Sequence, residues 1–485
     1  MSIIDTIDPA DAVDLTPSTD LVRATSPVDA TNLIRATGPV DAADLIPAIG
    51  AVAAADLISA IDPGDSVRIA RVPRRRVRTI RVALAGCGTV GGELVRILAH
   101  GADEIRARHG IRFELVSVLV KHPDRPRPGE LPRDRLTTDV DAFLRTEADV
   151  VVEAIGGIDP ALRVAHEVLR AGRRLVTANK ALIAAHGPAL AAVVRRSGGR
   201  LDFESAVAGG IPIVRALRDS LGLTGIGSVR GILNGTTNFI LTRLGDGRRY
   251  ADALAEAQAR GFAEANPARD LTGEDAADKL RILAWLAFGV RPDALVLRRR
   301  GIDRDPERLA ADAALLGGVP RLVAEVVDLG GGRIASAVEP VIVPAASELG
   351  RTRDEENAVV VASRLNGRVR LSGPGAGGAP TASALLGDML RGSGRAGRAP
   401  AQLYTPVEDP REHRWVLSIP REPRAQGILD RTLRRAGVAL TDVHAEPGRL
   451  VAVTRPVAWP RLDLATRVLE AERLLPVVSR CEVEG

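Results

Sequence analysis

Residues 79–91 read TIRVALAGCGTVG, an apolar run followed at once by closely spaced glycines. The run 80–85 has the composition of a buried parallel strand, and the glycines open the sequence of a helix. Glycine allows a tight turn between the two and lets a pyrophosphate approach the N–H groups at the positive end of the helix. We therefore predict a dinucleotide-binding turn that contains Gly86 and Gly88, although one such motif is only moderately specific.

Three further strands are predicted at 113–120, 149–154 and 174–177, and helical sequence follows the last two. Strands that alternate with helices predict an α/β fold, with a doubly wound parallel sheet of the Rossmann type. The ligand crevice of such a sheet lies at the carboxyl ends of its strands. Gly156 and Lys180 are therefore expected on the cofactor side.

The second strand ends at Lys121, where an NAD-preferring site usually has an acidic residue that holds the ribose hydroxyls. Lys121, with Arg125 nearby, favours a 2′-phosphate and therefore NADP. The alternative is an NAD site in which Lys121 is only a solvated strand end, and the two interpretations carry nearly equal weight.

The pattern changes after about residue 205. Strands interleaved with long helices predict a second, α+β domain over 206–372, and the order βαββαβ predicts a ferredoxin-like domain over 412–485. The dinucleotide-binding domain is assigned to 77–205 and is completed by 373–395. Residues 1–76 are rich in Asp, Ala and Pro and carry a weak repeat, which is typical of a low-complexity, disordered extension.

Composition limits the function classes. A stretch of 18 apolar residues and the pattern of a secretory signal are both lacking, so we expect no membrane association and a cytoplasmic location. The net charge is only +5 and aromatics are 2% of residues, which argues against nucleic-acid binding. Cys87 and Cys481 stand too far apart to suggest a disulfide framework or a zinc site.

Lysine is rare in this chain. Of 66 Lys and Arg residues, only Lys121, Lys180 and Lys279 are lysine. Lysine differs from arginine in carrying a compact ammonium whose pKa can be tuned, so these three positions are candidates for chemistry. The alternative is that three lysines occur by chance in an arginine-rich composition.

Asp275 and Lys279 lie four residues apart on one face of a predicted helix, which a capping box at Thr272 would start and which continues to residue 288. Glu264 precedes this helix in an acidic loop. The carboxylates could hold a substrate ammonium, and the lysine could pass a proton to an oxygen that becomes an alkoxide. Such a pair is more often a surface ion pair, but the rarity of lysine argues against that interpretation here.

Residues 79–395 resemble the homoserine dehydrogenases. Five blocks carry the resemblance in the family's order: 177–180 (TANK), 203–212 (FESAVAGGIP), 231–238 (GILNGTTN), 264–279 and 373–382. The resemblance implies an NAD(P)-dependent oxidoreductase that interconverts L-aspartate 4-semialdehyde and L-homoserine, in the biosynthesis of threonine, methionine and isoleucine. It also implies a homodimer or homotetramer.

The same resemblance implies roles for single residues. Lys279 would be the proton donor and acceptor, and Lys180 would face both nicotinamide and substrate and could share that duty. Glu264 and Asp275 would hold the amino-acid end of the substrate. The substrate-binding backbone would include Gly235 and Thr236, although Asn234-Gly235 alone suggests a hairpin turn. The cofactor pyrophosphate would contact Gly88, Thr89 and Val90, and Gly377 would close over it.

The family resemblance also places a monovalent cation such as Na⁺ near the loop after residue 203. Its ligands would be the carboxylate of Glu204 and the carbonyls of Val207, Gly209 and Ile211. From the sequence alone, the better interpretation of this loop is a tight turn that needs glycine.

The last domain resembles an ACT module, which would bind threonine as an effector. Its first turn, 421–425, reads REPRA where the module usually has Asp-x-Pro-Gly-Val, so a role in subunit association alone is the alternative.

Two other functions are alternatives to the one that this resemblance implies. Aspartate-semialdehyde dehydrogenase chemistry needs a nucleophilic cysteine, and Cys87 lies inside the glycine turn while Cys481 lies near the chain end. A catalytically silent amino-acid sensor would keep the fold but not the turnover.

Overall fold

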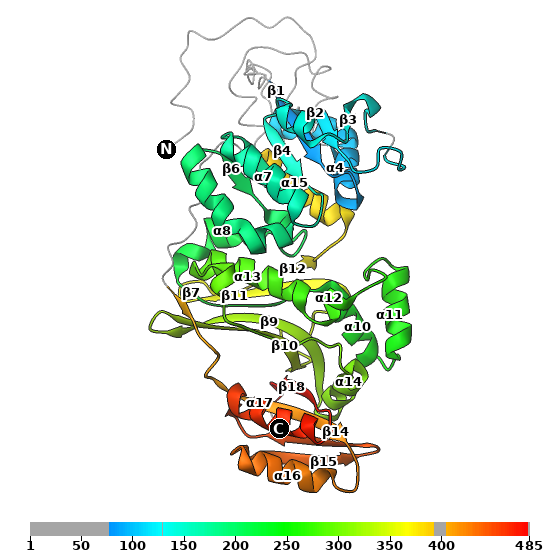
Figure 1. Cartoon of the computed structure of the whole chain (residues 1–485), viewed down its shortest axis with the longest axis vertical. Helices are drawn as coiled ribbons and strands as arrows, with labels where there is room; N and C mark the ends of the chain where they lie inside the picture. Colours follow the sequence, from blue (N-terminus) through cyan, green and yellow to red (C-terminus); the bar gives the residue numbers. More distant parts are fainter. Residues whose placement is uncertain (1–76, 129, 392–403, 484–485) are drawn as a thin grey trace, which may run out of the picture. The chain divides into compact units, whose positions relative to one another are not determined.

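The computed structural model describes residues 77–128, 130–391 and 404–483 (Figure 1). The extension predicted over 1–76 lies outside the described residues. Within them, no helix has both the length and the apolar character that a membrane crossing requires.

The first sheet is parallel throughout and has the strand order β3-β2-β1-β4-β5-β6. This is the order of a doubly wound dinucleotide-binding sheet, so the predicted Rossmann-type architecture is confirmed. The short strands β3 and β6 were not predicted from the sequence. The bounds are β1 Arg78–Ala85, β2 Ile111–Leu119, β3 Leu136–Thr137, β4 Val150–Glu153, β5 Arg174–Thr177 and β6 Arg200–Asp202.

Helices pack on this sheet and include one from far along the chain. Ala382, Leu385 and Met389 of α15 share a buried cluster with strand β1, so the chain returns to the first domain as predicted. The helices are α4 Thr89–His100, α5 Ala102–His109, α6 Val140–Arg145, α7 Asp159–Arg170, α8 Lys180–Ser197 and α15 Gly378–Leu390.

A second sheet begins with the order β12-β11-β7-β9-β10, in which neighbours are antiparallel. Its strands are β7 Ile226–Ile232, β9 Gly318–Gly330, β10 Arg333–Pro344, β11 Glu356–Ser363 and β12 Gly367–Pro374, and β8 Leu297–Arg299 pairs with β10. The segments between them form α9 Ile213–Asp219, α10 Gly235–Gly245, α11 Tyr250–Ala259, α12 Ala268–Leu271, α13 Glu274–Phe288 and α14 Pro306–Leu315.

The C-terminal segment has the predicted βαββαβ order, with the sheet order β18-β14-β16-β15 and antiparallel neighbours. Its sheet is not separate, because β18 pairs in parallel with β10 and joins the two sheets into one. The elements are β14 Glu412–Pro420, α16 Ala425–Arg435, β15 Leu440–Glu446, β16 Arg449–Thr454, β17 Val457–Ala458, α17 Trp459–Ala471 and β18 Val477–Cys481.

A buried ion-pair network stabilises this junction. Arg480 of β18 lies 3.1 Å from a carboxylate oxygen of Glu325 on β9 and 3.3 Å from one of Glu339 on β10. Burial alone would raise the pKa of Glu325, but Arg480 and Arg411 outweigh it and lower that pKa to about 2. The carboxylate therefore stays ionised and holds the joined sheets together.

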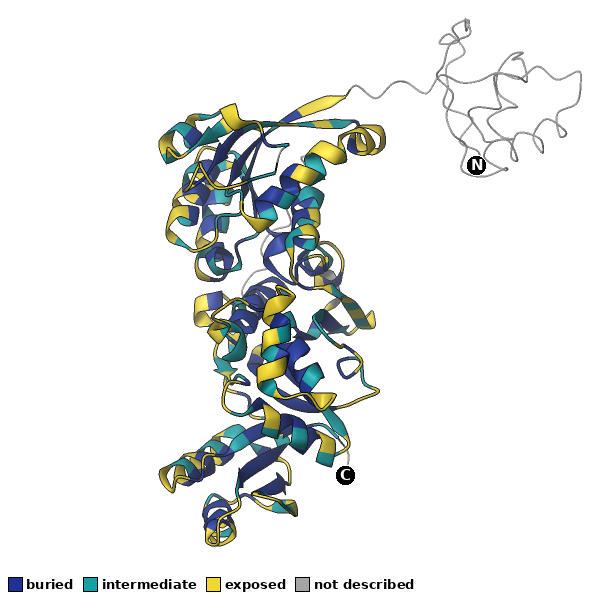
Figure 2. Cartoon of the chain, turned by 90° about the vertical axis from the view of Figure 1, so that its right-hand side faces the viewer, coloured by how far each residue is buried: buried dark blue, intermediate teal, exposed yellow. Residues whose placement is uncertain are grey.

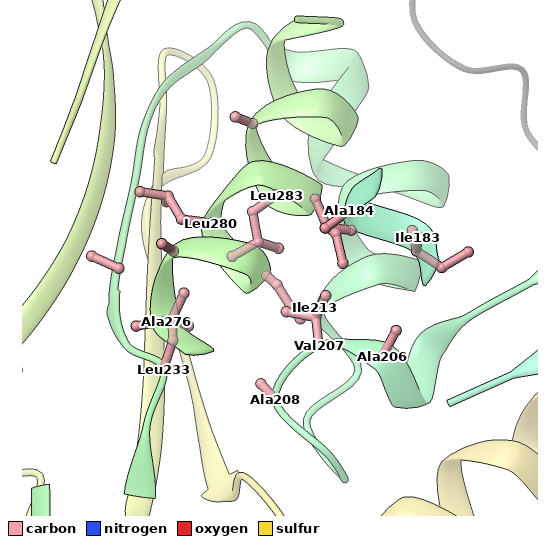
Figure 3. Close-up of a cluster of buried hydrophobic side chains, with 14 of the residues drawn as sticks. Ile183, Ala184, Ala206, Val207, Ala208, Ile213, Leu233, Ala276, Leu280 and Leu283 are labelled. Carbon is pink, nitrogen blue, oxygen red and sulfur yellow. The ribbon is translucent and has the colours of Figure 1, made fainter. Parts of the chain in front are cut away.

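Helix α13 lies in the middle of the largest hydrophobic core. Figure 2 shows that the central strands of both sheets are largely buried, and Figure 3 shows Leu283 of α13 near Ala184 of α8 and Ile213 of α9, in a cluster that also contains Leu280. A helix that is buried on nearly all sides is held rigidly by its neighbours. The polar residues that α13 carries are therefore fixed in place.

Candidate active site

The glycine turn after β1 is shaped to admit a ligand. A Cβ on Gly86, whose φ is +95°, would lie 2.5 Å from the carbonyl oxygen of Ala154, and one on Gly91 would lie 2.1 Å from the carbonyl oxygen of Gly86. In contrast, a Cβ on Gly88 would meet nothing within 4 Å, and no side chain caps α4 there. The first N–H groups of α4 are thus available to a pyrophosphate.

The returning segment reaches the same turn. Gly377, with φ +108°, precedes α15, and a Cβ on the next residue, Gly378, would lie 3.4 Å from Thr89. The structure thus brings the segment that follows Gly377 close to Thr89. Gly156, with φ +79°, follows β4 and has open space where a side chain would be.

Basic residues lie along the loop after β2. Lys121 is exposed, as expected for a residue that could contact a ribose phosphate. Arg127, which the sequence argument missed, donates to the carbonyls of His122 and Pro123 at 2.6 and 2.9 Å. Its guanidinium is also close to Cys87. No local motif marks Arg127, because its position depends on how the loop folds back to the glycine turn.

Cys87 is not set up as a nucleophile. Burial raises the pKa of its thiol above the ordinary value, although Arg127 opposes the shift. A reactive cysteine needs the opposite shift, because the thiolate is the nucleophile. This argues against the aspartate-semialdehyde dehydrogenase alternative.

A buried network at the ends of β4 and β5 positions Lys180. The hydroxyl of Thr177 donates to the carboxylate of Glu153, and the N–H of Ile155 donates to it at 2.8 Å. Asn179 caps α8 by accepting from the N–H of Leu182 at 3.0 Å, so that Lys180 is the first residue of the helix. Glu153 was not predicted as a site residue. The signal that could have identified it is a glutamate at the end of a buried strand.

Asp275 joins the two candidate lysines. Its Oδ2 accepts from Lys279 Nζ at 2.8 Å, and its Oδ1 lies 2.6 Å from Lys180 Nζ. Lys279 also donates to the carbonyl oxygen of Leu233 at 2.6 Å. Asp275 and Lys279 are only 4% and 7% exposed, so the surface ion-pair interpretation is wrong.

The charges of this cluster support one another. Burial would raise the pKa of Asp275, but Lys279 and Lys180 outweigh it and hold that pKa well below its usual range. Burial would lower the pKa of Lys180, but Asp275 outweighs it and the pKa is raised. An ionised carboxylate therefore keeps a lysine ammonium at the edge of the crevice.

Asn234 and Asp270 complete the cluster and were not predicted as site residues. Asn234 Nδ2 donates to Asp270 Oδ1 at 2.7 Å and to Asp275 Oδ2 at 2.8 Å. Its Oδ1 accepts from the N–H of Thr237 at 2.8 Å and so caps α10. The hairpin interpretation of Asn234-Gly235 is therefore wrong, because β7 leads into a helix there.

Two other predicted substrate residues lie at the start of α10. A Cβ on Gly235 would lie 2.7 Å from the carbonyl oxygen of Glu355, so the backbone is closely packed there. The hydroxyl of Thr236 donates to the carbonyl oxygen of Phe262 at 2.6 Å. Thr236 thereby ties α10 to the loop that carries Glu264.

The predicted capping box at the start of α13 is wrong. Thr272 does not cap it: its hydroxyl donates to the carbonyl oxygen of Ala268 at 2.8 Å, and the N-cap is Gly273, with φ +77°. The short helix α12 ends at this point and needs a left-handed residue, which overrides the capping box.

Glu264 lies on the exposed loop before α12. Among the described residues, no hydrogen bond or ion pair joins its side chain to Asp275 or Lys279, and the acid beside them is Asp270.

The predicted cation loop is buried and strained. Ala208 and Gly209 both have φ +55°, while Val207 and Ile211 are buried. Glu204 accepts from the N–H groups of Val214 and Arg215, each at 2.9 Å. Arg215 Nε also lies 3.7 Å from Oε2, so Oε1 is the carboxylate oxygen that keeps a lone pair for another partner.

The electrostatics of Glu204 suit a bound cation. Burial and the neighbouring Asp388 raise its pKa to about 7, and a cation beside it would restore the ionised form. The carbonyl oxygen of Ile211 already accepts from the N–H of Ile213 at 2.8 Å. No group of three His, Cys, Asp or Glu side chains within the described part of the chain could hold a metal ion, so any cation there would depend on backbone carbonyls.

Comparison with known proteins identifies the family. Residues 212–390 match the family model of homoserine dehydrogenase, and 86–204 match the model of its NAD-binding domain. The homoserine dehydrogenase of Corynebacterium glutamicum is 37% identical over 426 residues, which are 82% of this chain and 94% of that protein. The chain belongs to the homoserine dehydrogenase family. Its activity is the NAD(P)-dependent interconversion of L-aspartate 4-semialdehyde and L-homoserine, a step of amino-acid biosynthesis.

Solved structures of the homoserine dehydrogenase family agree with this assignment. The enzyme from Thiobacillus denitrificans is 30% identical with a TM-score of 0.74, and the match covers 84% of this chain and 99% of that chain. A hyperthermophilic archaeal homoserine dehydrogenase in complex with NADPH is 26% identical with a TM-score of 0.54, and the match covers 64% and 97%. The resemblance seen in the sequence is confirmed, and the first domain is an NAD(P)-binding domain.

Proposed function

We propose that Lys279 is the proton donor and acceptor of the homoserine dehydrogenase reaction in this chain. The observation that carries the proposal is the buried ammonium of Lys279, held by Asp275 and by the carbonyl oxygen of Leu233. These contacts engage two of its three protons, so the third is available to a substrate oxygen. A bound nicotinamide would supply a hydride to the aldehyde carbon of the semialdehyde. Lys279 then protonates the new alkoxide, and in the oxidative direction it takes that proton back.

Lys180 and the acids position the substrate. The Lys180 side chain is 39% exposed and bound to Asp275, so it can reach the crevice while its charge stays fixed. Glu264 and Asp275 are the acids that we assign to the substrate amino group. Asp270 is added to them because its carboxylate shares Asn234 with Asp275. Gly235 and Thr236 would supply backbone contacts.

The proposed cofactor is NADP, with NAD as the alternative. Gly86, Gly88, Thr89, Val90, Gly156 and Gly377 would line the dinucleotide, and Lys121 would face the 2′-phosphate. Support comes from the guanidinium of Arg127 beside the glycine turn, which adds a second cation where a phosphate would lie.

The remaining assignments rest on the family. A monovalent cation such as Na⁺ would be held by Glu204 and the carbonyls of Val207, Gly209 and Ile211. We assign the C-terminal βαββαβ segment to an ACT-like module, for threonine or for subunit association, in a homodimer or homotetramer. A reducing, cytoplasmic location is supported by the free thiols.

The test is a Lys279→Ala variant assayed for homoserine oxidation and for NADPH binding. General acid–base catalysis contributes about 10²–10⁴-fold, so kcat should fall by at least about 10²-fold while the Kd for NADPH stays within about twofold. Arg281→Ala, two positions along the same helix with a side chain that is 32% exposed, is the matched control and should keep wild-type turnover. Retained turnover in Lys279→Ala would overturn the assignment.

A further inference from the structure

A second cavity lies away from the nicotinamide crevice, between the catalytic sheet and the C-terminal segment. Its volume is about 400 Å³, within the range of small-ligand sites. One wall is the segment 299–305 that joins β8 to α14, and the other is helix α17 with Trp459, Asp463 and Glu470. The reaction proposed above uses none of these residues.

Three of the four acids that line this cavity already have partners, and the fourth, Asp303, is exposed. Glu470 pairs with Arg304, and Asp463 lies 2.6 Å from Arg467. Asp305 accepts from the N–H of Arg308 at 3.0 Å, which caps α14. The cavity thus offers few free acceptors to a ligand.

Arg300 is the unsatisfied group. One of its terminal nitrogens, Nη2, donates to the carbonyl oxygen of Val478, but the other, Nη1, is buried and has no hydrogen-bond partner among the described residues. The guanidinium carbon lies 4.8 Å from the ring centroid of Trp459. Burial lowers the pKa of Arg300 to about 10, although Glu339 opposes the shift. A buried cation with an unused donor is costly, and an entering anion would remove that cost.

The wall that carries Arg300 is tightly joined to the start of the catalytic helix. A Cβ on Gly301 would lie 2.0 Å from the carbonyl oxygen of Leu271. That oxygen accepts from the N–H of Ile302 at 2.7 Å, and the carbonyl oxygen of Thr272 accepts from Arg299 Nη1 at 2.8 Å. Thr272 stands three positions before Asp275, so a shift of this wall moves the N-terminus of α13.

We propose that this cavity binds a small organic carboxylate, whose carboxylate pairs with Arg300 and whose apolar body lies against Trp459, and that its occupancy changes turnover through the segment 271–273. Arginine matches a carboxylate in geometry as well as in charge. The effect on turnover rests on the proposed roles of Asp275 and Lys279. The binding itself does not.

The experiment compares three probes of similar size by titration calorimetry on the full chain: butyrate, L-2-aminobutyrate and 1-aminopropane. At least one of the two acids should bind saturably, and the amine, which lacks a carboxylate, should not. A difference between the two acids shows whether a ligand ammonium contributes. The proposal would be overturned if neither acid bound at a concentration of about 10 mM, or if the amine bound as well as the acids.

Variants then locate the site. Arg300→Gln should weaken binding of the acid by at least about tenfold, because a charged hydrogen bond is lost. Arg467→Gln removes another arginine of the same cavity, already paired with Asp463, and should leave binding within about threefold. Equal binding by Arg300→Gln and the wild type would overturn the assignment. If Arg300→Gln does not fold, a crystal structure of the wild type with the acid decides, because its carboxylate must contact Arg300.

The last arm measures turnover. A saturating acid should change kcat or KM at least twofold in the wild type and leave Arg300→Gln unaffected. An effect on turnover that persists in Arg300→Gln would show competition at the active site. That result would contradict coupling between the cavity and the active site. Binding of the acid without any change in turnover would contradict the coupling as well. Loss of activity in Lys279→Ala is independent of these binding results, so the two proposals fail separately.

Discussion

Asp275→Asn removes the charge that joins Lys279 and Lys180 while preserving the shape of the side chain. Asp275 is 4% exposed and its Oδ2 lies 2.8 Å from Lys279 Nζ. Removing one partner of such a buried pair costs about 3–5 kcal/mol, because the other charge stays buried without compensation. The more exposed Lys180 adds little to that loss. We expect the free energy of unfolding to fall by about 3 kcal/mol or more.

The same substitution has an electrostatic signature in the active site. Without Asp275, only burial acts strongly on Lys180, so its pKa should change from above its ordinary value to below it. Turnover, which uses the charged Lys180 to position the substrate, should then fall at alkaline pH sooner than in the wild type. The pH profile of kcat in both directions measures this change.

Urea unfolding followed by circular dichroism gives the stability change, with Asp278→Asn as the control. Asp278 lies on the same helix but pairs with Arg269 and Arg281 near the surface, so its loss should cost less than about 1 kcal/mol. An Asp275→Asn protein with the unfolding midpoint and pH profile of the wild type would refute the reasoning.

Three other outcomes follow from the structure. Arg127→Gln should raise KM for NADPH at least about threefold and leave KM for NADH nearly unchanged; equal effects on both cofactors in steady-state assays would contradict the 2′-phosphate assignment. Gly86→Ala should weaken NADPH binding and lower the melting temperature, because its Cβ would lie 2.5 Å from a carbonyl oxygen; wild-type values in fluorescence titration and calorimetry would contradict this. The depressed pKa values of Asp275 and Glu325 mean that these ionised carboxylates stabilise the fold above about pH 4, and that this stability is lost as the pH falls further. Equal free energies of unfolding at about pH 5 and about pH 3 would be evidence against the ion-pair networks of both residues.

The parts of the fold that the sequence predicted are those with local signals. The strand and glycine turn over 79–91, the pair Asp275–Lys279 and the return of 373–395 each carry their information within a few residues, or within a block that the family shares. Periodicity and spacing report such features directly. The βαββαβ order of the C-terminal segment was recognisable for the same reason.

The remaining parts depend on contacts across the chain. Asn234 reaches Asp270 and Asp275 over 36 and 41 residues, and no spacing rule connects such positions. The pairing of β18 with β10 was likewise hidden, because each strand alone is consistent with either sheet. The capping box at Thr272 was misleading because the preceding helix α12 ends there.

A crystal structure with L-homoserine and NADP⁺ bound is the most direct test of the central claim. We expect Lys279 Nζ to lie about 2.6–3.2 Å from the hydroxyl of homoserine, with Asp275 still between the two lysines. A homoserine hydroxyl that contacts other groups, with Lys279 Nζ beyond hydrogen-bond reach, would contradict it.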